Sequence, residues 1–220
     1  MQQHRNPWRY RLIASAWLAL AIPVIGCGSE VRIGGASVHA AFADPQAGAL
    51  AAAAAARGEV AEIDRLVQAG ADVNATGKDN VTPLAIALAK RNLAGVKRLL
   101  ALGADPNHVL VRDKDPRQRT ALLYLVVVGD AFDERFLEAF LQHGGNPNTL
   151  ASNSQSLLML AVHKRPYVEL LLRYGADINY QTIGESTALW DAVALNQLDT
   201  AQYLLEQGAS VGLEKVAVTL

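Results

Sequence analysis

The stretch Leu99-Leu-Ala-Leu-Gly-Ala-Asp-Pro-Asn107 constrains this chain most, because recognisable copies of it recur along the sequence. The glycine at its fifth position has counterparts in every copy, giving Gly70, Gly103, Gly144, Gly175 and Gly208. Successive glycines are 33, 41, 31 and 33 residues apart. A period of about this length is typical of proteins built from stacked supersecondary units, so the sequence predicts a stacked repeat protein.

Each copy has the features of a helix end. A run of leucines supplies an apolar stripe, and the glycine then ends the helix in the left-handed conformation, which costs a residue with a Cβ roughly 1–2 kcal/mol. Twelve residues after three of the glycines, a hydroxyl residue precedes a new apolar run, at Thr82, Ser156 and Thr187. Thr and Ser cap helix N-termini, and a proline such as Pro83 suits the first turn. Each unit is therefore predicted to contain two helices.

Taken together, these motifs resemble ankyrin repeats, whose signature is T-P-L-H-x-A followed by a second helix and a G-A-D-V-N turn. No unit has the histidine of that signature, because Ala85, Leu123, Met159 and Trp190 stand in its place. The resemblance implies an all-α fold over residues 47–220: an ankyrin-repeat solenoid of about five helix-turn-helix repeats joined by β-hairpin-like loops. The alanine-rich run from Leu50 fits the first helix of an N-terminal capping repeat.

The apolar stripes of each helix pair are expected to form the core by stacking on their neighbours. In the fifth unit this prediction applies to Leu189, Val193, Leu198, Ala201, Leu204 and Leu205, and Trp190 is expected to pack between repeats. The third unit is irregular, because Thr120 follows Gly103 by 17 residues instead of 12. The five extra residues are predicted to lengthen the loop at 109–119.

The N-terminus has the pattern of an export signal. Arginines Arg5, Arg9 and Arg11, without any acidic residue, precede an apolar run that ends at Ile25. The following Val24-Ile-Gly-Cys27 resembles the bacterial lipobox, which implies that Cys27 is lipidated. We interpret residues 1–26 as a signal peptide of the lipoprotein type and residues 27–46 as a flexible tether.

The location of the protein follows from that interpretation. The residue after the cysteine is Gly28, not the Asp that the resemblance associates with inner-membrane retention, so the expected location is the cell envelope, as an outer-membrane lipoprotein facing the periplasm. The alternative is an ordinary secretory cut after Ala43, which would leave Asp44 as the N-terminus of a soluble periplasmic or secreted protein.

The sequence offers no pattern for catalysis or for a cofactor. Its five histidines are scattered without metal-ligand spacing, and it contains neither a nucleophile elbow nor a phosphate-binding glycine loop. Without the three arginines of the leader, 17 basic residues remain against 21 acidic ones. This balance argues against a nucleic-acid partner, which needs a strong positive field. We therefore expect no enzyme activity, no metal and no cofactor.

The remaining prediction is binding through a surface. The resemblance implies a concave face built from loop tips and first helices, where another protein would bind. The N-terminal lipid would attach the protein to the membrane. One concrete form is an immunity-type protein against a periplasmic effector, and the alternative is a scaffold for an envelope enzyme or stress response. The basic group in the long loop is either a contact for an acidic partner or a solvated tip. The predicted binding residues are Lys78, Asp79, Arg112, Lys114, Arg117, Arg119, Tyr180, Gln181, Ile183 and Trp190.

Overall fold

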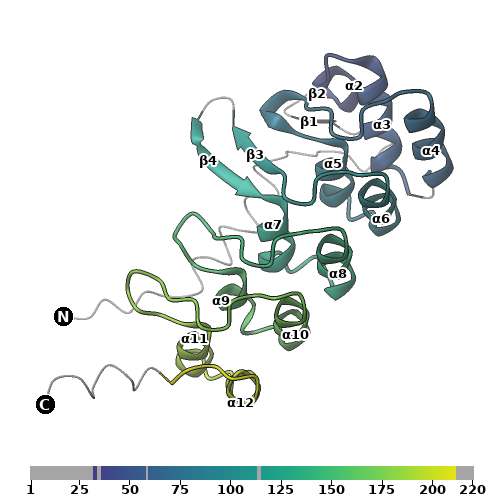
Figure 1. Cartoon of the computed structure of the whole chain (residues 1–220). Helices are drawn as coiled ribbons and strands as arrows, with labels where there is room; N and C mark the ends of the chain where they lie inside the picture. Colours follow the sequence, from purple (N-terminus) through teal and green to yellow (C-terminus); the bar gives the residue numbers. More distant parts are fainter. Residues whose placement is uncertain (1–31, 34–35, 58, 113–114, 212–220) are drawn as a thin grey trace, which may run out of the picture. The chain divides into compact units, whose positions relative to one another are not determined.

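The structure is a computed structural model that describes residues 32–33, 36–57, 59–112 and 115–211. It is mainly helical, as predicted, with successive helix pairs along the chain (Figure 1). The chain divides into two compact units, residues 1–145 and 146–220. We describe each unit separately.

The first unit holds three helix pairs, a short N-terminal segment before them and a β-hairpin before the third pair. Its elements are β1 (Arg32–Ile33), β2 (Ala36–Ser37), α2 (Val38–Ala41), α3 (Pro45–Ala55), α4 (Val60–Gln68), η1 (Lys78–Asn80), α5 (Pro83–Ala89), α6 (Leu93–Ala101), β3 (Val109–Arg112), β4 (Asp115–Ala121), α7 (Leu122–Val128) and α8 (Glu134–Gln142). The second unit holds two pairs: α9 (Leu157–Ala161), α10 (Arg165–Arg173), α11 (Ala188–Ala194) and α12 (Leu198–Glu206).

The five predicted helix ends are confirmed by the backbone. Gly70, Gly103, Gly144, Gly175 and Gly208 all have positive φ, between 87° and 99°. Three of the predicted caps are also present, because the side-chain oxygens of Thr82, Ser156 and Thr187 accept hydrogen bonds from the backbone three residues later. The repeat register read from the sequence therefore fixes where five helices end and where three begin.

The Asp and Asn of the repeated turn have separate structural roles. The Asp side chain accepts a bond from the backbone of the Asn two residues later, as Asp72 does from Asn74 at 2.8 Å. The Asn then reaches the next turn along the chain: Asn74 donates to the Gly103 carbonyl at 3.0 Å and accepts from the Asp105 N–H at 2.8 Å. In the second unit Asn148 makes the same two bonds, to Gly175 and Asp177. This ladder joins consecutive helix pairs within each unit.

The N-terminal segment differs from the prediction. Residues 27–46 were expected to be a flexible tether, but α2 packs against α3, and Val38 and Phe42 are buried. A Cβ on Gly48 of α3 would lie only 3.0 Å from the backbone of His39, so the two helices are in close contact. The packed part therefore begins before residue 47, because α2 contacts α3 and the Phe42 ring lies close to Gly77.

The long third loop forms the hairpin β3–β4, in which Val109 pairs with Ala121 and Val111 with Arg119. This confirms that the insertion lengthens the loop, and Figure 1 shows the hairpin extending away from α7. Thr120 does not cap the third unit's first helix, however, because it pairs with Leu110 in the hairpin. The helix begins at Leu122 behind Ala121, which provides no side-chain cap.

The fifth pair also departs from the prediction. Leu189, Ala201 and Leu204 are buried as expected. Three other members of the predicted core are exposed, namely Val193 at 54 %, Leu198 at 60 % and Leu205 at 47 %, and Trp190 is 66 % exposed rather than packed between repeats. The sequence predicts the apolar stripe correctly, but in the described residues no sixth helix pair covers it.

Candidate binding surface

Three loops that precede first helices are closed by the same backbone hydrogen bond. In the loops at 77–81, 151–155 and 182–186, the N–H of the first residue donates to the carbonyl of the fifth, with N···O distances of 2.7, 2.8 and 3.1 Å. The fourth residue of each loop is left-handed, with φ near 60°, at Asn80, Ser154 and Glu185. Each loop therefore presents its second and third residues at a defined tip.

The first of these loops lies against the hairpin in the first unit. The Asn80 side chain donates to the Val109 carbonyl at 2.8 Å, and His108 Nε2 lies 2.7 Å from the Asn80 carbonyl oxygen. These contacts bring Lys78, which is exposed, and Asp79, which is half-buried, beside the base of the hairpin. No local pattern predicts this contact between Asn80 and His108, because only the folded chain brings together residues 28 positions apart.

The basic residues of the long loop are only partly described. Arg119 lies on β4 with an exposed side chain. Arg112 and Arg117 belong to β3 and β4, but their side chains are not among the described groups. Lys114 lies outside the described residues, as does Cys27. The structure thus places Lys78, Asp79 and Arg119 on neighbouring loops of the first unit.

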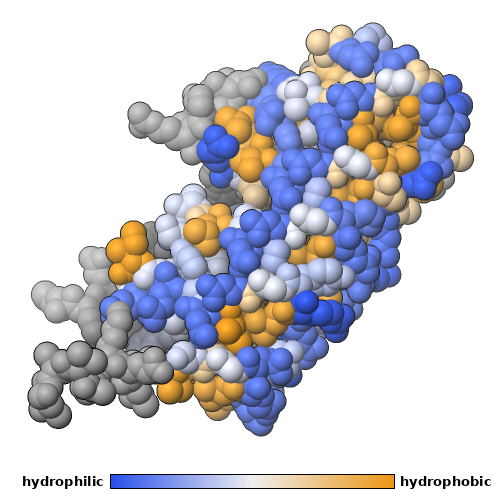
Figure 2. Space-filling model, in the orientation of Figure 1, coloured by the Kyte–Doolittle hydropathy of each residue, from blue (hydrophilic) through white to orange (hydrophobic). Residues whose placement is uncertain are grey.

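In the second unit, the loop before α11 is held at both ends. The Tyr180 hydroxyl donates to the Ser154 carbonyl at 3.0 Å, so this half-buried ring positions two loops rather than facing solvent. Gln181 is exposed and Ile183, at the tip, is 98 % exposed. Figure 2 shows apolar surface at the tip of this loop, with polar side chains beside it. The structure therefore brings Tyr180, Gln181 and Ile183 together on one ordered loop.

The base of the same loop is fixed to α11 through a carboxyl group. The Ser186 hydroxyl donates to Asp191 Oδ1 at 2.7 Å. Burial raises the pKa of Asp191 above its ordinary value of 3.8, although the Ser186 bond opposes that rise. The bond connects the end of the loop to the first helix and limits its movement.

Trp190 has a different position from these loop residues. It is the third residue after the cap Thr187 and lies in the first turn of α11, where its backbone N–H donates to Thr187 Oγ1 at 3.1 Å. Met159, at the same place after Ser156, is 2 % exposed. Trp190 therefore lies on the face that repeats use for stacking, not on a loop tip.

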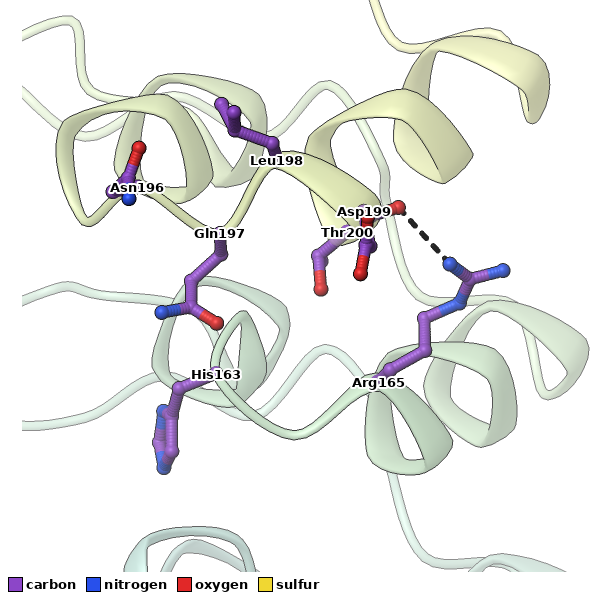
Figure 3. Close-up of a pocket in the computed structure, with 7 residues that line it drawn as sticks. All are labelled: His163, Arg165, Asn196, Gln197, Leu198, Asp199 and Thr200. Carbon is purple, nitrogen blue, oxygen red and sulfur yellow. Dashed lines mark hydrogen bonds between the residues drawn. The ribbon is translucent and has the colours of Figure 1, made fainter.

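A pocket of about 280 Å³ lies between the turns of the second unit's two helix pairs, lined by His163, Arg165 and residues 196–200 (Figure 3). The Arg165 guanidinium is already engaged, because it contacts Glu169 Oε1 at 2.7 Å and the Asp199 carbonyl at 3.0 Å. It also lies 3.7 Å from the Tyr203 ring centroid. These contacts join α10 to α12, so the pocket's main charged group has a structural role.

The described residues contain no group of three or more His, Cys, Asp and Glu side chains placed to hold a metal ion. Within the same part of the chain, the helices are too short or too polar to cross a membrane.

Comparisons with known proteins agree with the architecture. Residues 125–215 match the family described as ankyrin repeats, in three copies. The chain is 31 % identical over 177 residues to human SH3 and multiple ankyrin repeat domains protein 2, covering 79 % of this chain and 9 % of that protein. It is 29 % identical over 160 residues to an ankyrin repeat and KH domain-containing protein of Caenorhabditis briggsae, covering 71 % of this chain and 6 % of the relative. The chain thus spans less than a tenth of the length of either relative.

Proposed function

Because this chain is an ankyrin-repeat solenoid, we propose that it is a non-catalytic protein-binding module of the bacterial cell envelope that captures or inhibits another protein. Ankyrin repeats indicate a protein–protein interaction module. We propose in addition its location in the envelope, its mode of action and the residues through which it binds.

The observation that carries the proposal is the loop that presents Ile183. A large aliphatic side chain that is 98 % exposed sits on a turn closed by the Thr182–Ser186 bond and fixed behind by the Tyr180–Ser154 bond. A loop that is ordered before binding loses less conformational entropy on association. Burying one such side chain contributes about 1.5–3 kcal/mol, so Ile183 is a suitable central contact.

A second loop surface is available in the first unit. Exposed Lys78 and Arg119 there lie on neighbouring loops, and charges at an interface rim act mostly on the rate of encounter. We assign these residues, with Arg112, Lys114 and Arg117 of the same hairpin, to contact with an acidic part of the partner.

The proposed anchor is a lipid on Cys27. Packing of α2 against α3 supports this start of the mature chain over a cut after Ala43, because that cut would remove α2 and the buried side chains of Val38 and Phe42. Two or more acyl chains make membrane attachment stable where one does not. A tether shorter than the expected 27–46 would then hold the repeats near the bilayer.

An immunity-type role is one concrete form of this function. A rigid surface neutralises an effector by covering its active site, which requires complementarity but no chemistry. The scaffold alternative would use the same loops to hold a resident envelope protein.

Site-specific photo-crosslinking tests the proposal. A photoreactive residue replaces Ile183 in the full chain, expressed in its native envelope, and the matched control carries it at Glu206, which is exposed on α12. We expect one dominant adduct from position 183, suppressed by excess wild-type chain, and none of that mass from position 206. Equal adducts from both positions, or none from 183, would exclude this loop as the binding surface.

A further inference from the structure

The fifth helix pair leaves an apolar face uncovered among the described residues. Trp190 and Val193 of α11 and Leu198 and Leu205 of α12 are each about half exposed or more. Figure 2 shows apolar surface at the end of the unit that carries α11 and α12. Monomeric proteins seldom expose contiguous apolar patches unless something binds them.

The repeat register identifies this surface as a stacking face. Met159 and Val162 occupy, in the fourth pair, the places of Trp190 and Val193, and they are 2 % and 0 % exposed. They belong to or adjoin α9, against which α11 packs. The exposed side chains therefore lie where another element would cover them, as α11 covers the fourth pair.

The turn after α12 lacks the side chains that would join a further pair. Earlier turns carry an Asp or Asn at the third place and an Asn at the fifth, and that Asn bonds to the next turn. The fifth turn has Ser210 and Gly212 at these places. The ladder thus ends at the bond from the Ser210 N–H to Asn179 Oδ1, which argues for a covering element other than a sixth ladder-linked repeat.

The first unit offers a precedent in the same molecule. There, α2, which belongs to no repeat, packs against α3, and its Val38 is buried. A flanking segment of the chain thus packs against the first helix of the first pair, in keeping with the need of repeat arrays for capping elements at their ends.

We propose that residues 212–220 pack across the exposed face of α11 and α12 and cover Trp190. This segment follows Val211 directly and carries Leu213, Val216, Val218 and Leu220, the last three at alternating positions. The turn before it returns to α12, because the Ala209 N–H donates to the Leu204 carbonyl at 2.8 Å. The described chain therefore ends close to the C-terminal end of α12.

The length of residues 212–220 and their covalent attachment to the repeats favour this segment over a second molecule as the occupant. Nine extended residues span about 30 Å, whereas a nine-residue helix such as α12 is about 14 Å long. Covalent attachment makes the contact intramolecular, with an effective concentration in the millimolar range. The glutamate and lysine of the segment, Glu214 and Lys215, cancel in charge and place no net charge on the apolar face.

Trp190 provides the probe for a direct test. The chain has three tryptophans, Trp8, Trp17 and Trp190, so Trp8→Phe and Trp17→Phe in the full chain leave Trp190 as the only one. Acrylamide quenching of its emission is compared between this parent and the variant L213S/V216S/V218S/L220S. The matched control is E214S/K215S/T219S, which alters the polar residues of the same segment.

We expect the apolar-to-serine variant to raise the quenching constant of Trp190 several-fold and to shift its emission to the red, while the control resembles the parent. An unchanged circular dichroism spectrum shows that the helices persist. As a second readout, any loss of stability in this variant should largely disappear in a Trp190→Ser background, because the two changes remove one contact.

Two results would overturn the proposal. If Trp190 is as accessible to quencher in the parent as in the variant, the segment does not cover it. Shielding that grows with protein concentration, together with the mass of two chains in sedimentation, would identify a second copy as the occupant. Neither result bears on the Ile183 loop, so this inference and the proposed function fail separately.

Discussion

Gly175→Ala tests the physical basis of the repeat register. Gly175 ends α10 with φ of 87°, and a Cβ built there meets no atom within 4 Å. The substitution therefore creates no clash, and its cost is the backbone strain of a left-handed residue with a Cβ. That strain is about 1–2 kcal/mol.

Gly184→Ala is the matched control, nine positions along the same unit. A Cβ at Gly184 would meet only the Thr182 hydroxyl oxygen at 3.9 Å, and its φ is not positive. Alanine there should be neutral or should stabilise by about 0.4–1 kcal/mol, because it restricts the unfolded chain.

Urea unfolding followed by circular dichroism measures both variants. We expect the midpoint to fall for Gly175→Ala and to hold or rise for Gly184→Ala, with little change in slope. If the two variants shifted the midpoint equally, or if Gly175→Ala were as stable as the wild type, the helix-stop argument would be refuted.

Three further predictions concern anchoring, association and pH. Cys27→Ser should move the protein from the membrane to the soluble fraction and abolish incorporation of labelled fatty acid; unchanged fractionation would contradict lipidation. Replacing Arg112, Arg117 and Arg119 by Ala should slow association with the partner and flatten its salt dependence without altering thermal stability, and stopped-flow rates equal to wild type would identify a solvated loop. Burial raises the pKa of Asp191 above 3.8 in the folded protein, so its protonated form contributes stability that is complete below pH 3.8 and is lost as the pH rises through the raised folded value. Asp191→Asn should therefore stabilise the protein near neutral pH and not below pH 3.8. A pH-independent effect of this substitution in urea unfolding would contradict the prediction.

Local patterns predicted the repeat correctly where one residue fixes the backbone. Gly103 and its four counterparts are left-handed as expected, and Thr82 caps α5, because both effects depend on a few neighbouring residues. Thr120 has the corresponding position in the third unit but does not cap its helix, because the inserted residues extend the hairpin through it; no local signal distinguishes the two outcomes.

Predictions that depend on neighbours in space were less accurate. Val193 and Leu198 have the pattern of core residues, but their burial requires a further element, which the pattern of one helix cannot reveal. The same limit applies to residues 38–42, whose composition indicates a tether although α2 packs against α3 in the fold. Among the predicted binding residues, Ile183 is exposed at a tip, whereas Tyr180 positions a loop.

The most direct test of the central claim is the affinity of the crosslinked partner for the Ile183→Ser variant, with Glu206→Ser as the control. Loss of the apolar contact should weaken binding by about 1.5–3 kcal/mol, which is roughly ten-fold to a hundred-fold in Kd, while the control binds like the wild type. Equal Kd values for Ile183→Ser and the wild type would contradict the claim that this ordered loop is the centre of the binding surface.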